Sequence, residues 1–362
     1  MTVYYFTVLI IILWALTQRI IHPKNLQKCN KRIARVSFVL ILLVIGLRHQ
    51  SMGLDLYWKY QSGYLGWFDR IANAKISAIP YYAAMTKYEF GFILLNKVIG
   101  FFTDNRQVYL FICAALSILP VGNLVKKESK DALLSVAVFI GMPSFLYLFG
   151  TIRQSIAMGL LTYSFFEIEK RNLKKFVGIV LIAATFHSAA LFFLLVYPAY
   201  RFKCNLNKRL VSLGIILAVF LGKSILIRFT IGFFKGYEIS SDASSLVFFV
   251  FFLIYVFFVI ITKIKKTNDR IEGLLNVLFL ACCCLAFQGV TPVAARLGVY
   301  YLIFMVILVP EVVSVIDDRL PRALLYMLLV AVFMGYGLYR LYIGGESFAI
   351  SYPFYWFWNK VS

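Results

Sequence analysis

The sequence predicts an all-α fold, a polytopic transmembrane helical bundle of about 10–12 spans with additional re-entrant helices. Of the 362 residues, 62% are apolar and 15% are charged, and the mean hydropathy is +0.83. A soluble domain has roughly a quarter of its residues charged. Here the apolar residues form blocks of about 14 to 20 residues between charged clusters, the pattern of helices that cross a bilayer. We expect residues 1–362 to form a single integral membrane domain.

Basic residues predict how these spans are oriented. Because Lys and Arg accumulate in cytoplasmic loops, we expect the basic stretches to face the cytoplasm and both termini to lie outside. The net charge of +21 is spread between the spans rather than gathered on one surface, which argues against a nucleic-acid groove. Most of the 37 basic residues occupy six stretches, Gln18–Arg35, Val125–Asp131, Glu169–Lys175, Arg201–Arg209, Lys263–Arg270 and Ile316–Arg322.

An even number of crossings must separate two cytoplasmic loops, and this requirement predicts two breaks. The apolar stretch Phe90–Phe102 should return to the side it came from, as an interfacial or re-entrant helix. The apolar block of about 25 residues between Lys175 and Arg201 should be two short helices that meet at Phe186–Ser188, with the joint in a protein-lined cavity. The first apolar run, Val3–Leu16, has no basic residue before it and no small-residue cleavage site after it, so we expect a retained span.

Ionisable residues from distant segments gather on the predicted outer side. At span ends or inside apolar blocks such residues are costly, and by default they mark function. Each also has a structural interpretation: the arginines as snorkelling anchors, the acids as residues that begin helices, and the histidine as a satisfied buried group. Asp55 could also pair with Lys59. Together, arginines beside a histidine would suit a lipid pyrophosphate, because a guanidinium binds phosphate oxygens bidentately and stays charged. These residues are Arg48, Asp55, Glu89, Arg153, His187 and Arg296.

Other features of the chain narrow the chemistry. The outer segment 48–102 is rich in Tyr and Trp, which stack on sugars or form interfacial belts. The sequence has no Walker loop, no dinucleotide fingerprint, no HExxH and no metal-ligand cluster. The six cysteines are divided between basic loops and apolar segments, and we interpret them as packing residues. We therefore expect no cofactor and no metal.

Five short motifs follow one another in a fixed order. They are Arg48 with Gly53, Asp55 and Tyr60; Tyr88 with Glu89, Gly91 and Phe92; Ile152 with Arg153, Gln154 and Ala157; Phe186 with His187, Ser188 and Ala189; and Arg296 with Tyr300. In order and spacing they resemble the EpsG family of exopolysaccharide polymerases, a branch of the Wzy-type proteins, over most of the chain from Gly46 to Tyr300. The family usually has an aromatic residue directly after the aspartate and a tyrosine four residues beyond it, where this chain has Leu56 and Lys59.

The resemblance implies a fold related to GT-C-like membrane glycosyltransferases. It also implies a metal-independent glycosyltransferase that polymerises O-antigen, capsule or exopolysaccharide at the outer leaflet of the bacterial cytoplasmic membrane. In that reaction a growing chain on undecaprenyl pyrophosphate passes to a hydroxyl of an incoming lipid-linked repeat, without a nucleotide. The protein must neutralise charge as the glycosidic bond breaks and must supply a base for the acceptor hydroxyl.

The hypothesis gives each candidate residue a role. The arginines bind the pyrophosphate, and His187 is the candidate base because its ordinary pKa is close to neutral. Asp55 or Glu89 would orient the histidine or one of the sugars. The phosphate-binding residues are Arg153 and Arg296, with Arg48 in support, and the sugar-binding residues are Tyr57, Tyr60, Gln154 and Tyr300.

Other classes of membrane protein stay open beside the polymerase. An O-acyltransferase that modifies surface polysaccharide admits a cytoplasmic acyl donor, so it should carry polar catalytic residues near the inner face. A flippase for lipid-linked oligosaccharides should place charges at several depths, and a membrane scaffold would not need the outer charges. Partners implied by the polymerase hypothesis are the lipid-linked oligosaccharide, membrane lipid, a chain-length regulator and a flippase, with no nucleic acid.

Overall fold

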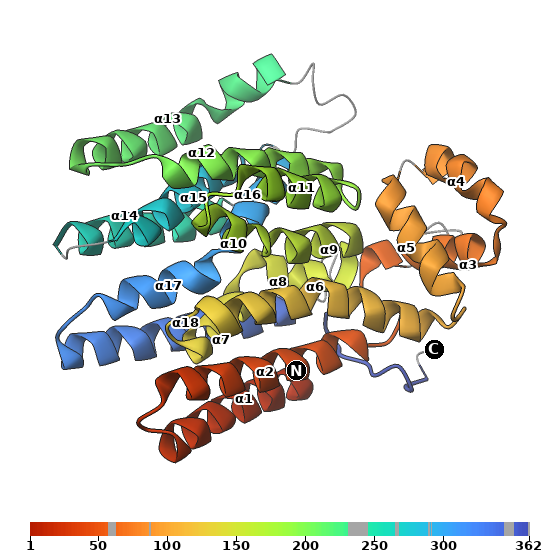
Figure 1. Cartoon of the computed structure of the whole chain (residues 1–362), viewed down its shortest axis with the longest axis horizontal. Helices are drawn as coiled ribbons and strands as arrows, with labels where there is room; N and C mark the ends of the chain where they lie inside the picture. Colours follow the sequence, from red (N-terminus) through yellow and green to blue (C-terminus); the bar gives the residue numbers. More distant parts are fainter. Residues whose placement is uncertain are drawn as a thin grey trace. The chain divides into compact units, whose positions relative to one another are not determined.

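The computed structural model of the protein is helical (Figure 1). It describes residues 1–56, 63–86, 88–230, 245–264, 268–288, 290, 292–343 and 351–360. In these ranges no residue belongs to a β-strand, and Arg48 and Trp356 form an isolated antiparallel bridge. The all-α prediction is therefore confirmed.

The chain divides into two compact units, and we describe each by itself. The first unit comprises Met1–Leu191 with Tyr326–Ser362, and the second comprises Phe192–Leu325. The long helices of the first unit are α1 (Thr2–Ile21), α2 (Leu26–Gly46), α6 (Arg106–Glu128) and most of α18 (Arg319–Ile343). Its shorter helices are α7 (Ala132–Gly141), α8 (Pro143–Gly150), α9 (Ile152–Leu161), α10 (Ser164–Glu169) and α11 (Leu173–Ala184).

The predicted outer segment of the first unit is built from short elements. They are the 3₁₀ turns η1 (Leu54–Leu56) and η3 (Ile76–Ala78) and the helices α3 (Tyr64–Asn73), α4 (Ile79–Thr86) and α5 (Phe90–Gly100). Helix α5 has 11 residues. At 1.5 Å per residue this is about 16 Å, half of a bilayer core, so a helix of this length does not cross. The length fits the predicted interfacial or re-entrant helix.

The second unit contains longer apolar helices. The 3₁₀ helix η4 (Ser188–Leu195) leads into it from the first unit. Its α-helices are α12 (Val196–Arg201), α13 (Leu206–Thr230), α14 (Leu246–Ile264), α15 (Asp269–Leu285), α16 (Pro292–Leu302) and α17 (Met305–Ser314).

Among the described residues, five helices are long and apolar enough to cross a bilayer, namely α1, α6, α13, α14 and α18. The number rises to seven when two bent pairs are each counted as one span, α7 with α8 (65°) and the Arg296–Leu302 part of α16 with α17 (46°). The sequence predicts about 10–12 spans; the count of five to seven includes only described helices of sufficient length and apolar composition, and several other apolar blocks form helices too short to cross alone. The chain is nevertheless a multi-pass membrane protein.

Polar residues set where these helices begin. Asn25, Asp131, Asn172 and Asn268 each accept a hydrogen bond from a backbone N–H of the first turn of the helix that follows, at 2.9–3.1 Å. Such caps satisfy N–H groups that have no partner within the helix. All four lie in or beside the predicted cytoplasmic loops.

Within each unit, two of the basic stretches contact each other. This agrees with the prediction that they face the same side of the membrane. In the first unit Arg19 forms an ion pair with Asp131 at 2.6 Å, which joins the first two stretches. In the second unit Lys203 pairs with Asp269 at 3.5 Å, and Arg209 donates to the main-chain oxygen of Glu272 at 3.0 Å. Each of these pairs of loops therefore lies at one end of its unit.

The opposite end of the first unit collects segments that the topology assigned to the outside. The main-chain N–H of His49 donates to the Tyr355 carbonyl at 2.8 Å, and that of Phe357 donates to the Leu47 carbonyl at 3.0 Å. The hydroxyl of Tyr4 donates to the Ser351 carbonyl at 2.5 Å. The start of α1, the end of α2 and residues 351–360 therefore lie together, in agreement with the prediction that both termini share a side.

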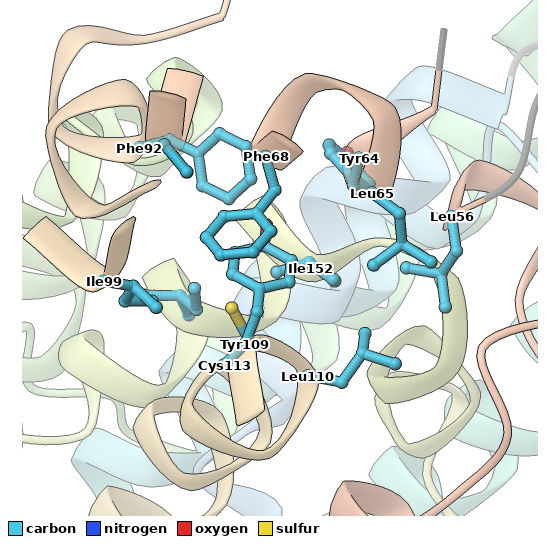
Figure 2. Close-up of a cluster of buried hydrophobic side chains, with 12 residues drawn as sticks. Leu56, Tyr64, Leu65, Phe68, Phe92, Ile99, Tyr109, Leu110, Cys113 and Ile152 are labelled. Carbon is cyan, nitrogen blue, oxygen red and sulfur yellow. The ribbon is translucent and has the colours of Figure 1, made fainter. Parts of the chain in front are cut away.

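A buried aromatic core holds α3, α5, α6 and α9 together (Figure 2). The ring of Phe68 stacks on Tyr109 with centroids 4.3 Å apart, and Phe92 packs edge-on against Tyr64 at 5.4 Å. Ile152 of α9 enters the same cluster. Because aromatic pairs of this kind stabilise packing beyond their buried area, they fix the starts of α5 and α9 relative to each other.

Cysteine labelling tests the predicted sidedness. In a cysteine-free background, Asp104→Cys should react with a membrane-impermeant maleimide in intact cells, because Asp104 is exposed and precedes α6 at the predicted outer end. Lys130→Cys, exposed between α6 and α7, should react only after permeabilisation. Gel-shift labelling measures both, and the reverse pattern would contradict the topology.

Candidate active site

The carboxylate of Glu89 joins three segments of the first unit. Glu89 is the N-cap residue of α5, and its side chain is 17% exposed. One carboxylate oxygen, Oε1, accepts the main-chain N–H of Ser188 at 2.8 Å, and the other, Oε2, forms an ion pair with the Arg153 guanidinium. Three of the five predicted motifs therefore meet at one carboxylate.

Arg153 lies in the first turn of α9, with its side chain 20% exposed. Its Nη1 is bonded to Glu89, and its Nε donates to the Tyr64 hydroxyl oxygen at 3.2 Å. The guanidinium carbon lies 4.4 Å from the centre of the Tyr88 ring, close enough for a cation–π interaction. Among the described residues these hydrogen bonds use Nε and Nη1, which leaves the Nη2 edge for a further oxygen.

Glu89 is ionised at neutral pH. Burial alone would raise its pKa, but the Arg153 guanidinium and the Ser188 N–H favour the charged form, and the net result is a pKa below the ordinary value. A carboxylate with a lowered pKa is a weak base. Its geometry suits an orienting and charge-balancing group better than a proton acceptor.

The break in the apolar block after Lys175 is confirmed. Helix α11 ends at Ala184, and η4 begins at Ser188, which leaves His187 half-buried in the turn. His187 directly precedes Ser188, whose main-chain N–H donates to the Glu89 carboxylate. The chain beyond Leu191 belongs to the second unit. That the second of the two predicted short helices returns to the cytoplasmic side therefore stays a prediction.

Gly91 allows this turn to approach α5. A Cβ at Gly91 would lie 2.2 Å from the Thr185 hydroxyl oxygen and 2.8 Å from the Thr185 carbonyl oxygen. The N–H of Phe92 donates to that carbonyl at 3.3 Å. The close approach requires glycine, and it brings Ser188 within reach of Glu89.

Asp55 lies on η1, and its charge influences the same tyrosines. Its charge raises the pKa of Tyr64 and of Tyr88, although burial is the larger cause in both cases. The turn before it contains Gly53 at φ +115°, where a Cβ would lie 2.1 Å from the Phe149 carbonyl oxygen. Gly53 thus positions the Asp55 turn against Phe149 at the end of α8, four residues before Arg153.

Arg48 is buried, at 1% exposure. Its guanidinium donates to the main-chain carbonyls of Ile45, Met52 and Phe149, the last at 3.0 Å. The prediction named Arg48 as a phosphate-binding residue in support of two others. In this position it can support the site only by holding α2, the Asp55 turn and α8 together.

The remaining predicted residues fall outside this cluster or outside the described chain. Gln154 follows Arg153 but is 2% exposed. Arg296, exposed, and Tyr300, buried, lie on α16 of the second unit, so their participation stays a prediction. Tyr57 and Tyr60 lie outside the described residues.

The sequence did not assign Tyr64 and Thr185 to the site. Tyr64 belongs to the aromatic-rich segment 48–102, and its bond to Arg153 depends on the packing of α3 against α9. Thr185 had one signal in the sequence, the glycine at position 91 in the Tyr88–Phe92 motif, which implies a close neighbour.

Comparison with known proteins agrees with this arrangement of motifs. The EpsG family profile matches residues 31–354. The chain belongs to the EpsG family. This is a Wzy-type, polymerase-like family, and the match includes every residue of the Glu89 cluster in this EpsG-family protein. No curated protein and no solved structure matches the chain.

The lowered pKa of Glu89 predicts an acid-sensitive contribution to stability. Its folded-state pKa lies below the ordinary value of 4.5, so the stabilisation is fully present above pH 4.5 and is lost as the pH falls through the folded pKa. Glu89→Gln should remove this part of the stability–pH profile. Thermal unfolding in detergent between pH 3.5 and 7 measures it, with exposed Asp104→Asn as the control that keeps the wild-type profile.

Strain at Gly53 gives a second prediction. Gly53→Ala places a side chain at φ +115° and against the Phe149 carbonyl, so it should lower the stability by about 1–3 kcal/mol. Gly178→Ala, in α11 with nothing within 4 Å of the new Cβ, is the matched control and should be neutral or stabilising. Equal melting temperatures for the two variants would show that the close approach at Gly53 is not required.

Proposed function

We propose that this EpsG-family chain is a polysaccharide polymerase that joins undecaprenyl-pyrophosphate-linked oligosaccharide repeats at the outer leaflet of the bacterial cytoplasmic membrane. The observation that carries the proposal is the cluster of Arg153, Glu89 and the His187–Ser188 turn. It combines a permanent cation, an oriented carboxylate and a histidine, contributed by three segments at one end of the first unit.

In the proposed reaction one bond forms as another breaks. The acceptor hydroxyl oxygen of the incoming repeat attacks the anomeric carbon of the growing chain. The bond from that carbon to the pyrophosphate oxygen breaks, and the electron pair leaves with the lipid pyrophosphate. The hydroxyl proton passes to the base. No nucleotide is consumed, because the pyrophosphate is already an activated leaving group.

Arg153 is suited to the leaving group. Its Nη2 forms no hydrogen bond with the described residues. Its Nε donates to the Tyr64 hydroxyl, and its Nη1 is paired with the Glu89 carboxylate. A fixed guanidinium stabilises charge that develops on phosphate oxygens without having to reorganise. We assign Arg296 of α16 as a second pyrophosphate ligand.

His187 is the proposed base. Glu89 is held as a carboxylate with a lowered pKa, so it is the poorer proton acceptor of the two. We assign Asp55, whose charge raises the pKa of Tyr64 and of Tyr88, to orient an acceptor or donor sugar. Gln154, Tyr300, Tyr57 and Tyr60 are the proposed sugar contacts, and the charge on the arginines takes the place of a metal ion. A chain-length regulator and a flippase are the proposed partners in the membrane.

Single substitutions test these roles. With purified protein and lipid-linked repeats, Arg153→Ala should slow polymerisation about 10²–10³-fold. His187→Ala should slow it about 10²–10⁴-fold, the usual contribution of a general base. Arg153→Lys should recover part of the rate, because it keeps the charge but not the bidentate geometry.

Matched controls separate mechanism from folding. Arg106 forms an ion pair with Asp69 at 2.5 Å at the same end of the unit, so Arg106→Ala should keep most of the activity. His22→Ala, between α1 and α2, should behave likewise. A ladder of products spaced by one repeat, formed without added acyl donor, distinguishes a polymerase from an acyltransferase or a flippase. Wild-type rates from His187→Ala would remove it as the base.

A further inference from the structure

The second unit contains a cavity of about 500 Å³ between α12, α13 and α15. Its volume falls in the range that proteins use for ligands of drug or lipid-chain size. Its walls are largely apolar, with Phe202, Ile215, Phe279 and Leu280 among the lining residues. Val211, which also lines it, is 61% exposed, so the cavity opens onto the apolar outer surface of the unit. In a membrane protein this surface faces acyl chains.

Two cations stand at the same cavity. Lys208 is exposed, and its Nζ donates to the Lys203 carbonyl oxygen at 3.3 Å. Arg209 is 6% exposed, and its guanidinium donates to Asn276 Oδ1 at 2.6 Å and to the Glu272 main-chain oxygen at 3.0 Å. These acceptors are neutral atoms, so neither bond cancels the positive charge, and no acidic residue lines the described cavity.

The basic residues near the cavity also predict on which side of the membrane it lies. It lies where the basic stretches Arg201–Arg209 and Lys263–Arg270 meet, and the Lys203–Asp269 pair ties these loops together. Basic loops predict the cytoplasmic side. The cytoplasmic leaflet carries the anionic lipids, and basic pockets between membrane helices on that side bind their headgroups.

We propose that this cavity binds an anionic phospholipid from the cytoplasmic leaflet, with an acyl chain in the apolar part and the phosphate beside Lys208. Arg209 adds attraction from its buried position. The proposal does not rest on the proposed glycosyl transfer, because it uses other residues, all of them in the second unit. The complementary occupant is a lipid rather than a soluble anion, because most of the lining is apolar.

Native mass spectrometry of the full-length protein tests this proposal. Detergent-purified protein is mixed with phosphatidylglycerol or with phosphatidylcholine of the same acyl chains, and retained lipid is counted. We expect preferential retention of phosphatidylglycerol. Removing one cation near a membrane surface weakens this attraction about fivefold, so Lys208→Gln should lower retention by about that factor. Lys174→Gln is the control, since it too replaces an exposed lysine in the first turn of an asparagine-capped helix.

A second pair of variants tests the cavity itself. Ile215→Trp should fill it and reduce retention of the lipid. Leu217→Trp, on the same helix and 43% exposed against 44% for Ile215, does not line the cavity and should retain lipid as the wild type does. Size-exclusion profiles confirm that the variants remain folded. Equal retention of the two lipids, or wild-type retention by both Lys208→Gln and Ile215→Trp, would overturn the proposal.

Discussion

The outer end of the first unit depends on one carboxylate. Glu89 is mostly buried in aromatic surroundings, where a lone negative charge would be strongly destabilised, so it must be matched by a cation and by hydrogen-bond donors. Arg153 and the Ser188 N–H meet that requirement from two other segments. The start of α5, the start of α9 and the turn after α11 are therefore fixed by the same electrostatic condition, and the tyrosines fill the space around it.

Much of this could be predicted from the sequence, because sidedness is a long-range constraint. Requiring all basic loops to share a side forced a break near His187, and it placed that break, Glu89 and Arg153 at one end. The structure brings these three together. The composition likewise predicted a helical membrane protein, because a bilayer permits few other ways to satisfy backbone polar groups.

Other features could not be predicted, because they depend on packing rather than on pattern. In the sequence, Arg48 could not be distinguished from the other outer arginines, Arg153 and Arg296. Its burial and its carbonyl partners depend on how α2 packs against α8. The bond from Arg153 to Tyr64 depends on the core around Phe68 and Tyr109. Hydropathy also does not show where a span is bent, since an apolar block has the same composition whether it forms one straight helix or two short ones, as at α7 and α8.

Glu89 acts as a resident counter-ion for Arg153, and under the proposed function this limits how tightly any anion is held. A lipid headgroup that bonds to the Nη2 edge meets a guanidinium whose charge is already balanced in part, so its affinity is lower than an unpaired arginine would give. Glu89 stays bonded when the spent carrier departs, so no buried cation is left without a counter-ion. Donor and leaving carrier share the same headgroup, so this weaker attraction limits product inhibition and favours turnover over retention.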